Sequence, residues 1–233
     1  MRCYAVSAVV LAILAASVTP AMAQTTTFSD AAFLNADWTL TTEVLNLGGT
    51  VTGTQVATGG TSGSYRRIVN TLNSAAGFGF SNTVYGFHAR AGALFSPIAS
   101  GAITGIDYAE SSIRLAAGVQ ACGVALVQGG VIYYGPAFVT PSTLNVWVPT
   151  AQTGLTAAMF DALAPGVQNP NFTAAGAPIQ FGFYRANSTS VGGGGSTLTG
   201  GIDDWVVNVH YDGATPTRGT SWGALKAGYK GRR

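Results

Sequence analysis

The chain has 233 residues and a formal net charge of +2, and 9% of its residues are charged, against about 25% in an average soluble protein. Aromatic residues make up 10%, which is enough for a packed core, whereas two Cys and two His leave little material for a disulfide scaffold or a zinc cluster. The small positive charge also argues against a strongly basic nucleic-acid binder.

The first 23 residues have the pattern of a secretory signal peptide. Arg2 supplies a positive start, an apolar run from Tyr4 to Val18 follows, and Ala21-Met22-Ala23 offers a small-x-small cleavage site. The run is shorter than the roughly 20 residues of a membrane span, so an uncleaved anchor is the weaker alternative and no transmembrane segment is expected. We predict an exported bacterial protein, secreted or held at the cell surface, with a signal peptide (1–23), one domain (24–213) and a tail (214–233).

Cleavage after residue 23 would remove Cys3 and leave Cys122 as the one thiol. A single thiol cannot form an internal disulfide, even in an oxidising compartment. Cys122 lies in the apolar run Val119–Val127, and no basic neighbour in the sequence would lower its pKa. We therefore expect a small buried hydrophobic residue rather than a nucleophile.

Between residues 24 and 213, segments rich in β-branched and aromatic residues alternate with Gly, Ser, Asn and Pro. Many short strands separated by such turn signals predict an all-β, jelly-roll-like β-sandwich. In the last segment, apolar residues occupy alternate positions from Trp205 onward, which predicts one buried face. The predicted strands are Val44–Val56, Tyr65–Leu72, Val84–Arg90, Ile113–Leu115, Gly118–Val127, Val131–Tyr134, Leu144–Val148, Ile179–Arg185 and Trp205–Tyr211.

One internal segment favours a helix. Leu155, Met159 and Leu163 recur at helical spacing, and Pro165 follows as a stop signal. The sequence therefore predicts one short helix over Thr156–Leu163.

The tail differs from the rest of the chain in charge. Residues 214–233 carry five basic side chains and no acid, whereas residues 24–213 carry nine acids against five arginines. Trp222, Leu225 and Tyr229 fall on one side of a short predicted amphipathic helix that Ser221 would cap. Two interpretations stay open: the apolar side docks on the sandwich, or the basic side attaches to an acidic surface, such as the body of a neighbouring copy.

Motifs in a fixed order span most of residues 27–211. They are Phe28–Asp30 leading to Asp37–Thr39, Gly59–Tyr65, Gly105–Tyr108, Gly135–Phe138, Trp147 before Leu155–Phe160, Pro178–Ser188 and Gly201–Val207. Taken together, they resemble secreted bacterial jelly-roll β-sandwich domains of the concanavalin/laminin-G-like and carbohydrate-binding-module-like type. Many members of that group have no assigned function.

The resemblance also implies a structural calcium ion. In such carbohydrate-binding modules an Ile-Asp-Asp-like start of the last strand commonly supplies a ligand, and Asp203 matches that position. Asp30 lies near the first-strand position, although the glutamate usual there is missing. Calcium takes about 6–8 oxygens, so carbonyls and water would complete the set. The alternative is that Asp203 and Asp204 are turn residues that accept backbone N–H bonds.

A sandwich that binds sugars would use aromatic side chains as platforms, because the C–H face of a sugar ring packs on Trp or Tyr while a few polar groups fix its orientation. For Trp38, Trp147 and Trp205 a core position is the stronger interpretation, because each lies in an apolar segment. The candidate platforms are Tyr133, Tyr134, Trp147 and Tyr184, and the candidate polar partners are Arg185, Asn187 and Asp107.

Residues suited to catalysis are scarce. Glu43 and Glu110 are the only glutamates and stand apart in sequence, so no glycosidase carboxylate pair is evident. No Gly-x-Ser-x-Gly elbow is present, and His88 and His210 are expected to be exposed strand residues. We therefore predict a non-catalytic module that binds carbohydrate or another cell-surface polymer, and no nucleic acid. The alternative is a structural or adhesive surface protein that self-associates through its basic tail; a glycan-active enzyme ranks below both.

Overall fold

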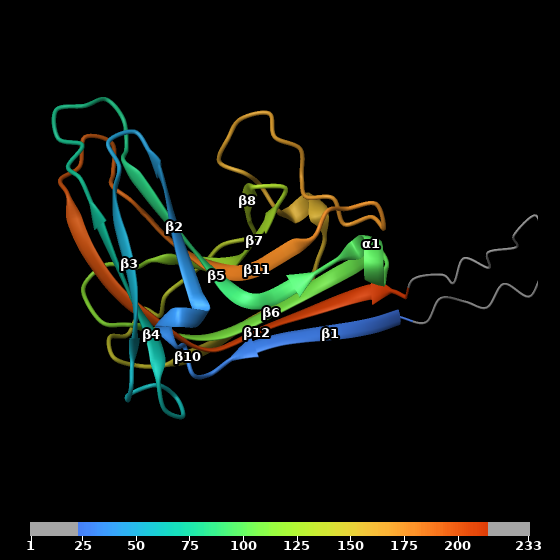
Figure 1. Ribbon diagram of the computed structural model, residues 1–233. Helices are drawn as coiled ribbons and strands as arrows, with labels where there is room; N and C mark the ends of the chain where they lie inside the picture. The colour runs from blue at the N-terminus through green and yellow to red at the C-terminus, as the bar shows by residue number, and fades with distance from the viewer. Residues whose placement is uncertain (1–22, 214–233) are drawn as a thin grey trace, which may run out of the picture.

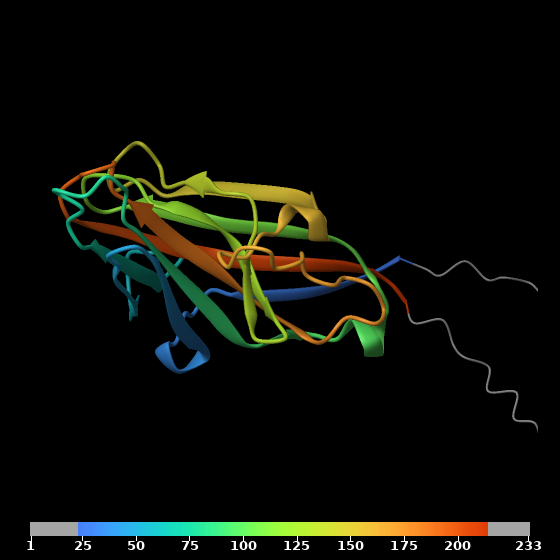
Figure 2. The same ribbon diagram turned by 90° about the horizontal axis from the view of Figure 1, so that it is seen from above.

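The computed structural model describes residues 23–213 (Figure 1). The predicted signal peptide, except Ala23, and the predicted C-terminal amphipathic helix lie outside the described residues. Ala23 pairs with Asp212, so both ends of the described part lie at the same end of the molecule (Figures 1 and 2).

Two antiparallel sheets form the protein, which confirms the predicted all-β, jelly-roll-like β-sandwich. Sheet A has the strand order β10 (Val148–Leu155), β6 (Ile103–Arg114), β12 (Ser196–Asp212), β4 (Tyr65–Leu72) and β3 (Gly49–Val56), and β1 (Ala23–Asp30) also pairs with β12. Sheet B has the order β2 (Trp38–Leu45), β5 (Thr83–Phe95), β11 (Ile179–Ser188), β7 (Ala121–Gln128) and β8 (Val131–Tyr134), and β9 (Phe138–Val139) pairs with β7.

The main core lies between the two sheets and is rich in aromatic rings. Trp38 of sheet B meets Trp205 of sheet A edge to face, with ring centroids 5.2 Å apart, and lies 5.1 Å from Phe183. In β12 the buried residues are Trp205, Val207 and Val209, as the alternating pattern predicts. Aromatic pairs of this kind add about 0.5–1.5 kcal/mol each beyond the area they bury.

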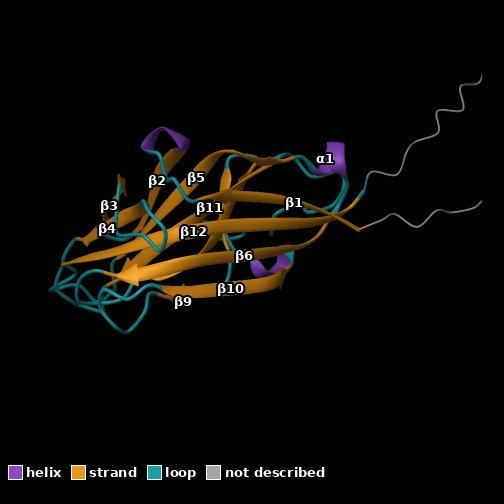
Figure 3. Cartoon of the chain, turned by 90° about the horizontal axis from the view of Figure 1, so that it is seen from below, coloured by secondary structure: helices purple, strands orange, loops and turns teal. Residues whose placement is uncertain are grey.

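Helices are confined to the connections between strands (Figure 3). The predicted helix over Thr156–Leu163 is wrong: the chain makes only the single 3-10 turn η2 (Ala157–Met159), after which Phe160 turns to extended geometry and enters the core. The other short pieces are η1 (Asn35–Asp37) and α1 (Pro97–Ser100), which begins at a proline. Within residues 23–213, no helix has the length and apolar character needed to span a membrane.

The predicted strands differ from the strands of the structure mainly where the chain turns. Tyr65–Leu72 and Val131–Tyr134 have the predicted bounds, whereas the single strand predicted over Val44–Val56 is wrong. Asn46 and Gly48 have φ angles of 68° and 75°, and this left-handed backbone forms the turn that separates β2 from β3. The segment predicted over Leu144–Val148 contains only an isolated bridge at Leu144, and β10 begins where that prediction ends.

Candidate functional site

The face of sheet B that points away from sheet A carries a second apolar cluster, separate from the main core. Its members are small or aromatic, and the partly buried Tyr85 and Ala121 pack against it. The buried members are Phe87, Ala89, Ala125, Tyr134, Tyr184 and Ala186. We call this surface the outer face.

One row of paired residues crosses the outer face through five strands. Tyr85 of β5 pairs with Glu43 of β2 on one side and with Ala186 of β11 on the other. Ala186 pairs with Ala121 of β7, which pairs with Val139 of β9. Directly paired residues point to the same side of a sheet, so Tyr85 and Val139 flank two methyl groups. The row therefore forms a trough with a low floor.

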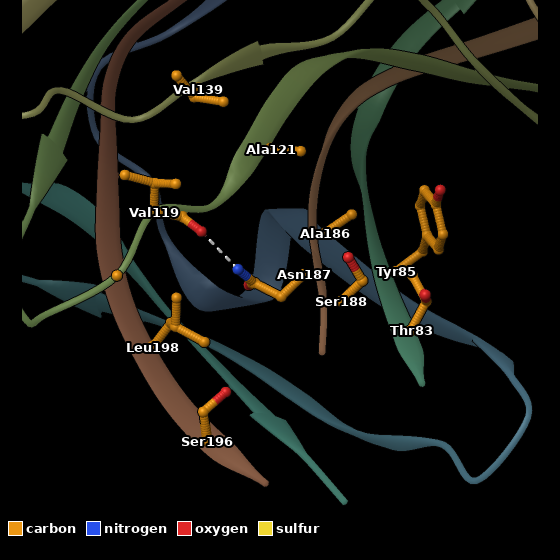
Figure 4. A pocket seen from close by; sticks show the side chains of 11 residues that line it. Thr83, Tyr85, Val119, Ala121, Val139, Ala186, Asn187, Ser188, Ser196 and Leu198 are labelled. Atoms are coloured by element: carbon orange, nitrogen blue, oxygen red, sulfur yellow. Dashed lines mark hydrogen bonds between the residues drawn. The ribbon is translucent and has the colours of Figure 1, made fainter. Parts of the chain in front are cut away.

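A hollow of about 460 Å³ is lined partly by this trough and partly by Gly118, Val119 and Asn187 and by Ser196 and Leu198 of β12 in sheet A. Figure 4 shows Ala121 and Ala186 between Val139 and Tyr85, with Asn187 nearby. The volume falls within the ~300–1,000 Å³ typical of ligand sites. Among the described residues, no charged side chain lines it. The polar side chains that do are Thr83, Asn187, Ser188 and Ser196, besides the Tyr85 ring.

The other half of the outer face is covered by the chain. The Tyr184 hydroxyl donates to the Gly135 carbonyl at 3.2 Å, and a Cβ built on Gly123 would come within 2.9 Å of the Pro136 carbonyl. The connection after β8 therefore lies directly on this half. Tyr134 is paired with Asp161 through its backbone, so the segment after η2 also lies over it. Only the half that contains Tyr85 is open.

Tyr134 supports Tyr85 from the covered side. Their ring centroids are 4.9 Å apart, and the Tyr134 hydroxyl donates to Glu43 Oε2 at 2.6 Å. Burial, together with this hydrogen bond, raises the pKa of Tyr134 well above its ordinary value. Burial also raises the pKa of Tyr85. Both phenols therefore stay protonated at neutral pH and keep their O–H donors.

Asn187, one of the predicted polar partners, lies at the hollow. Its Nδ2 donates to the Val119 carbonyl at 2.7 Å, as the dashed line in Figure 4 shows. Its Oδ1 accepts from Asn70 Nδ2 at 2.8 Å. Asn187 thus fixes the position of Val119 at the wall of the hollow. Because its partner Asn70 belongs to β4 of sheet A, Asn187 points to the inner side of sheet B, as Arg185 does two residues before it. Of the other residues predicted for ligand binding, Tyr134 and Tyr184 lie on the outer face, but both are buried below the covering segments.

Tyr133 and Arg185 point into the interior instead. Tyr133 belongs to the main core. Arg185 is fully buried and forms a bidentate ion pair with Glu110, in which Nη2 donates to Oε1 at 2.7 Å and Nη1 donates to Oε2 at 3.1 Å. Burial raises the pKa of Glu110, and the guanidinium of Arg185 opposes that rise. The structure therefore corrects the assignment of these two residues: they hold the sandwich together and do not reach a ligand.

Trp147 and Asp107 lie on the side of sheet A. The indole of Trp147 donates to the Gly59 carbonyl at 2.9 Å. Asp107 Oδ2 lies 2.8 Å from His210 Nε2, and its Oδ1 accepts from Gly154 N at 2.8 Å. Burial alone would raise the pKa of Asp107, but the bonds to Gly154 and His210 outweigh it, so the pKa of Asp107 is lowered. Neither residue joins the hollow.

Both aspartates of the implied calcium site have bonding partners within the protein. The carboxylate of Asp30 accepts from Ala32 N, Phe33 N and Trp38 Nε1 and forms an ion pair with Arg90 at 2.9 Å. Three hydrogen bonds and an adjacent guanidinium therefore already satisfy this carboxylate, so Asp30 does not fit the role of a calcium ligand.

Asp203 is fully buried and accepts from Thr61 N, Thr61 Oγ1 and Asp204 N. The bonds to backbone N–H groups agree with the alternative, but Asp203 and Asp204 lie at an irregularity within β12 and not in a turn before the strand. Among the described residues, no three or more His, Cys, Asp or Glu side chains gather where they could hold a metal ion. A calcium ligand role for Asp203 stays a prediction.

Two residues of this region were not anticipated from the sequence. Tyr85 and Glu43 become neighbours only through the pairing of β2 with β5. The signal for Tyr85 was present, because Tyr85 and Phe87 alternate with Val84 and Gly86 in a segment predicted as a strand.

The expectation that His88 is exposed was wrong. His88 is fully buried and stacks on the core ring of Phe183, and burial holds its pKa well below the ordinary value.

Comparison with known proteins gives neither a family nor a curated relative. No family model matches the chain, and no curated protein matches it. Three similar solved structures are carbohydrate-binding modules, each at 9–10% identity.

The first is the family 11 module from Clostridium thermocellum with a β-1,3-1,4-mixed-linked tetrasaccharide, with a TM-score of 0.46 over 78% of this chain and 94% of that one. The second is the CBM22-1 xylan-binding domain from Paenibacillus barcinonensis, with a TM-score of 0.38 over 82% and 95%. The third is TmCBM61 with β-1,4-galactotriose, with a TM-score of 0.30 over 77% and 98%. All three TM-scores are below 0.5, so we infer nothing about binding from them.

Proposed function

We propose that this protein is a non-catalytic module that binds polysaccharide in the trough on the outer face of sheet B. The observation that carries the proposal is the hollow of about 460 Å³ in which the half-buried Tyr85 ring stands beside hydroxyl and amide groups. An aromatic face offers a surface for the C–H side of a sugar ring, and a few polar groups fix its orientation.

The floor of the trough supports a flat ligand. Ala186 and Ala121 project only methyl groups, so a pyranose ring has room between Tyr85 and Val139. The Thr83 and Ser188 side chains lie one paired row away and offer hydroxyls that both donate and accept. Sugars present the same kind of groups, which makes the lining chemically complementary to them.

The lining also supports binding without catalysis. Glycoside hydrolysis needs two carboxyl groups about 5–9.5 Å apart across the scissile bond. The described residues that line the hollow include no Asp, Glu or His. Glu43 stands beside it as a lone carboxylate bonded to Tyr134.

The first test is a polysaccharide binding screen by affinity electrophoresis and calorimetry, with Tyr85→Ala and Trp147→Ala as a matched aromatic pair. Removing the Tyr85 platform should weaken binding by about 5–30-fold, the effect of losing roughly 1–2 kcal/mol of contact. Trp147→Ala should leave affinity within about twofold, because Trp147 lies on the side of sheet A. Thermal unfolding of both variants controls for lost structure.

Two outcomes would contradict the proposal. If wild type binds and Trp147→Ala loses binding while Tyr85→Ala does not, the site lies beside the Gly59 loop rather than in the trough. If a broad panel of neutral and charged polysaccharides gives no saturable binding, the polysaccharide function itself is wrong. Export rests on the pattern of residues 1–23 and stays a prediction.

A further inference from the structure

One carboxylate lies beside Tyr85, the aromatic residue of a hollow whose lining carries no charged side chain. Glu43 and Tyr85 are directly paired across β2 and β5, and both side chains belong to the outer face. Directly opposed residues in antiparallel strands have Cβ atoms about 4.5–5.5 Å apart. The charge of Glu43 therefore lies next to the proposed sugar platform.

The position of this charge is fixed. The Tyr134 hydroxyl donates to Glu43 Oε2 at 2.6 Å, and the Tyr134 ring packs on Tyr85. Within residues 23–213 the ion pairs use the carboxylates of Asp30, Asp37, Asp107 and Glu110, and none of them involves Glu43. A hydrogen bond from a neutral phenol holds the carboxylate in place but does not neutralise it.

Resting on the proposed polysaccharide function, we propose that Glu43 is a specificity-determining residue that makes the trough select neutral polysaccharides over chains bearing carboxylate or sulfate groups. A second negative charge about 7 Å from Glu43 should weaken binding about threefold in a water-like medium, and more where water is excluded. The effect should fade once the ionic strength brings the screening length below that distance, at about 0.2 M salt, and should be largely lost at about 1 M, where the screening length is about 3 Å.

The ligand probes are three forms of one neutral polymer that binds in the screen: the parent, a carboxymethyl derivative, and a hydroxyethyl derivative of equal substitution. The hydroxyethyl form carries a group of similar size without charge. It therefore separates steric exclusion from electrostatic exclusion. Dissociation constants are measured at low and at high ionic strength.

Three variants isolate the charge. Glu43→Gln keeps an oxygen that accepts from Tyr134 and removes the charge. Tyr134→Phe removes that hydrogen bond and keeps the charge. Asp107→Asn makes the same net change in charge on the opposite sheet, beside His210.

Wild type should bind the carboxymethyl form at least threefold more weakly than the hydroxyethyl form at low salt, and this gap should shrink at high salt. In Glu43→Gln the gap should fall by at least half while affinity for the parent polymer stays within twofold. Tyr134→Phe and Asp107→Asn should keep the full gap.

A gap that persists unchanged in Glu43→Gln overturns the specificity role, as does equal binding of both derivatives by wild type. Either result leaves the polysaccharide function intact so long as the parent polymer binds and Tyr85→Ala weakens it. If no neutral polymer binds to wild type, the proposed function fails and the role of Glu43 fails with it.

Discussion

At the scale of single residues, the interior of the sandwich contains a charged pair as well as apolar side chains. Arg185 and Glu110 are buried and join β11 of sheet B to β6 of sheet A. Removing an ion from water costs several kcal/mol unless a partner and hydrogen bonds compensate, so each residue is tolerated because of the other. Arg185 precedes Ala186 and Asn187, which line the hollow, so this link also supports the trough.

Glu110→Ala should destabilise the protein by about 3–5 kcal/mol, because it leaves the guanidinium of Arg185 buried without its partner. The double variant Glu110→Leu with Arg185→Met should lose less, since neither charge then remains. Urea unfolding measures both. If Glu110→Ala were as stable as wild type, water would have to reach Arg185, and the two residues could not be a buried ion pair.

Burial of Cys122 gives a second prediction at this scale. Burial raises the pKa of its thiol to about 12, from an ordinary value of 9.0. In a Cys3→Ser variant, a thiol reagent at pH 8 should therefore leave the folded protein unlabelled and label one thiol after unfolding, because the thiolate is the reactive form.

The sign of the pH dependence follows from the same shift. Between pH of about 9 and 12 the unfolded chain loses the Cys122 proton while the folded chain keeps it, so this residue's contribution to stability falls as the pH rises. Rapid labelling of the folded protein at pH 8 would contradict the burial of Cys122.

At the scale of strands, alternation determines which residues can share a site. Tyr133 and Tyr134 are adjacent in β8, so one enters the core and the other lies on the outer face. The sequence predicts β8 with the observed bounds, but both tyrosines were predicted to bind ligand, because the short apolar run of this strand does not show which of its faces is buried. Trp205–Tyr211 carries a clear period of two, and its buried face was predicted correctly.

The covering of the outer face gives a prediction for this scale. A Cβ on Gly123 would lie 2.7 Å from the Tyr184 ring and 2.9 Å from the Pro136 carbonyl. Gly123→Ala should therefore displace the covering connection and destabilise the protein by about 1–3 kcal/mol. Gly79→Ala is the matched control, since its Cβ meets nothing within 4 Å. Chemical unfolding compares them, and equal midpoints would mean that the connection does not rest on Gly123.

At the scale of the whole molecule, the site depends on pairings between strands that are distant in sequence. The row from Glu43 through Tyr85 and Ala186 to Ala121 and Val139 exists because four strand pairs share one register. Composition and turn signals were sufficient to predict a sandwich. They do not determine register, and a slip of one residue would move every side chain of a strand to the opposite face. An aromatic and polar lining could therefore be anticipated for a candidate site, whereas the residues that line the hollow could not.

The remaining alternative for the whole protein is a surface protein that self-associates through its basic tail. Residues 214–233 carry five basic side chains and no acid, and residues 24–213 carry more acids than bases. If the tail joins copies through charge, the protein should self-associate at low ionic strength, and the association should vanish in high salt or when the chain ends at Gly213. Sedimentation velocity measures the mass of both chains. A monomeric mass under all conditions would exclude assembly through the tail.

Binding of a neutral polymer in the trough should survive the truncation and respond little to salt, because it depends on ring packing and neutral hydrogen bonds.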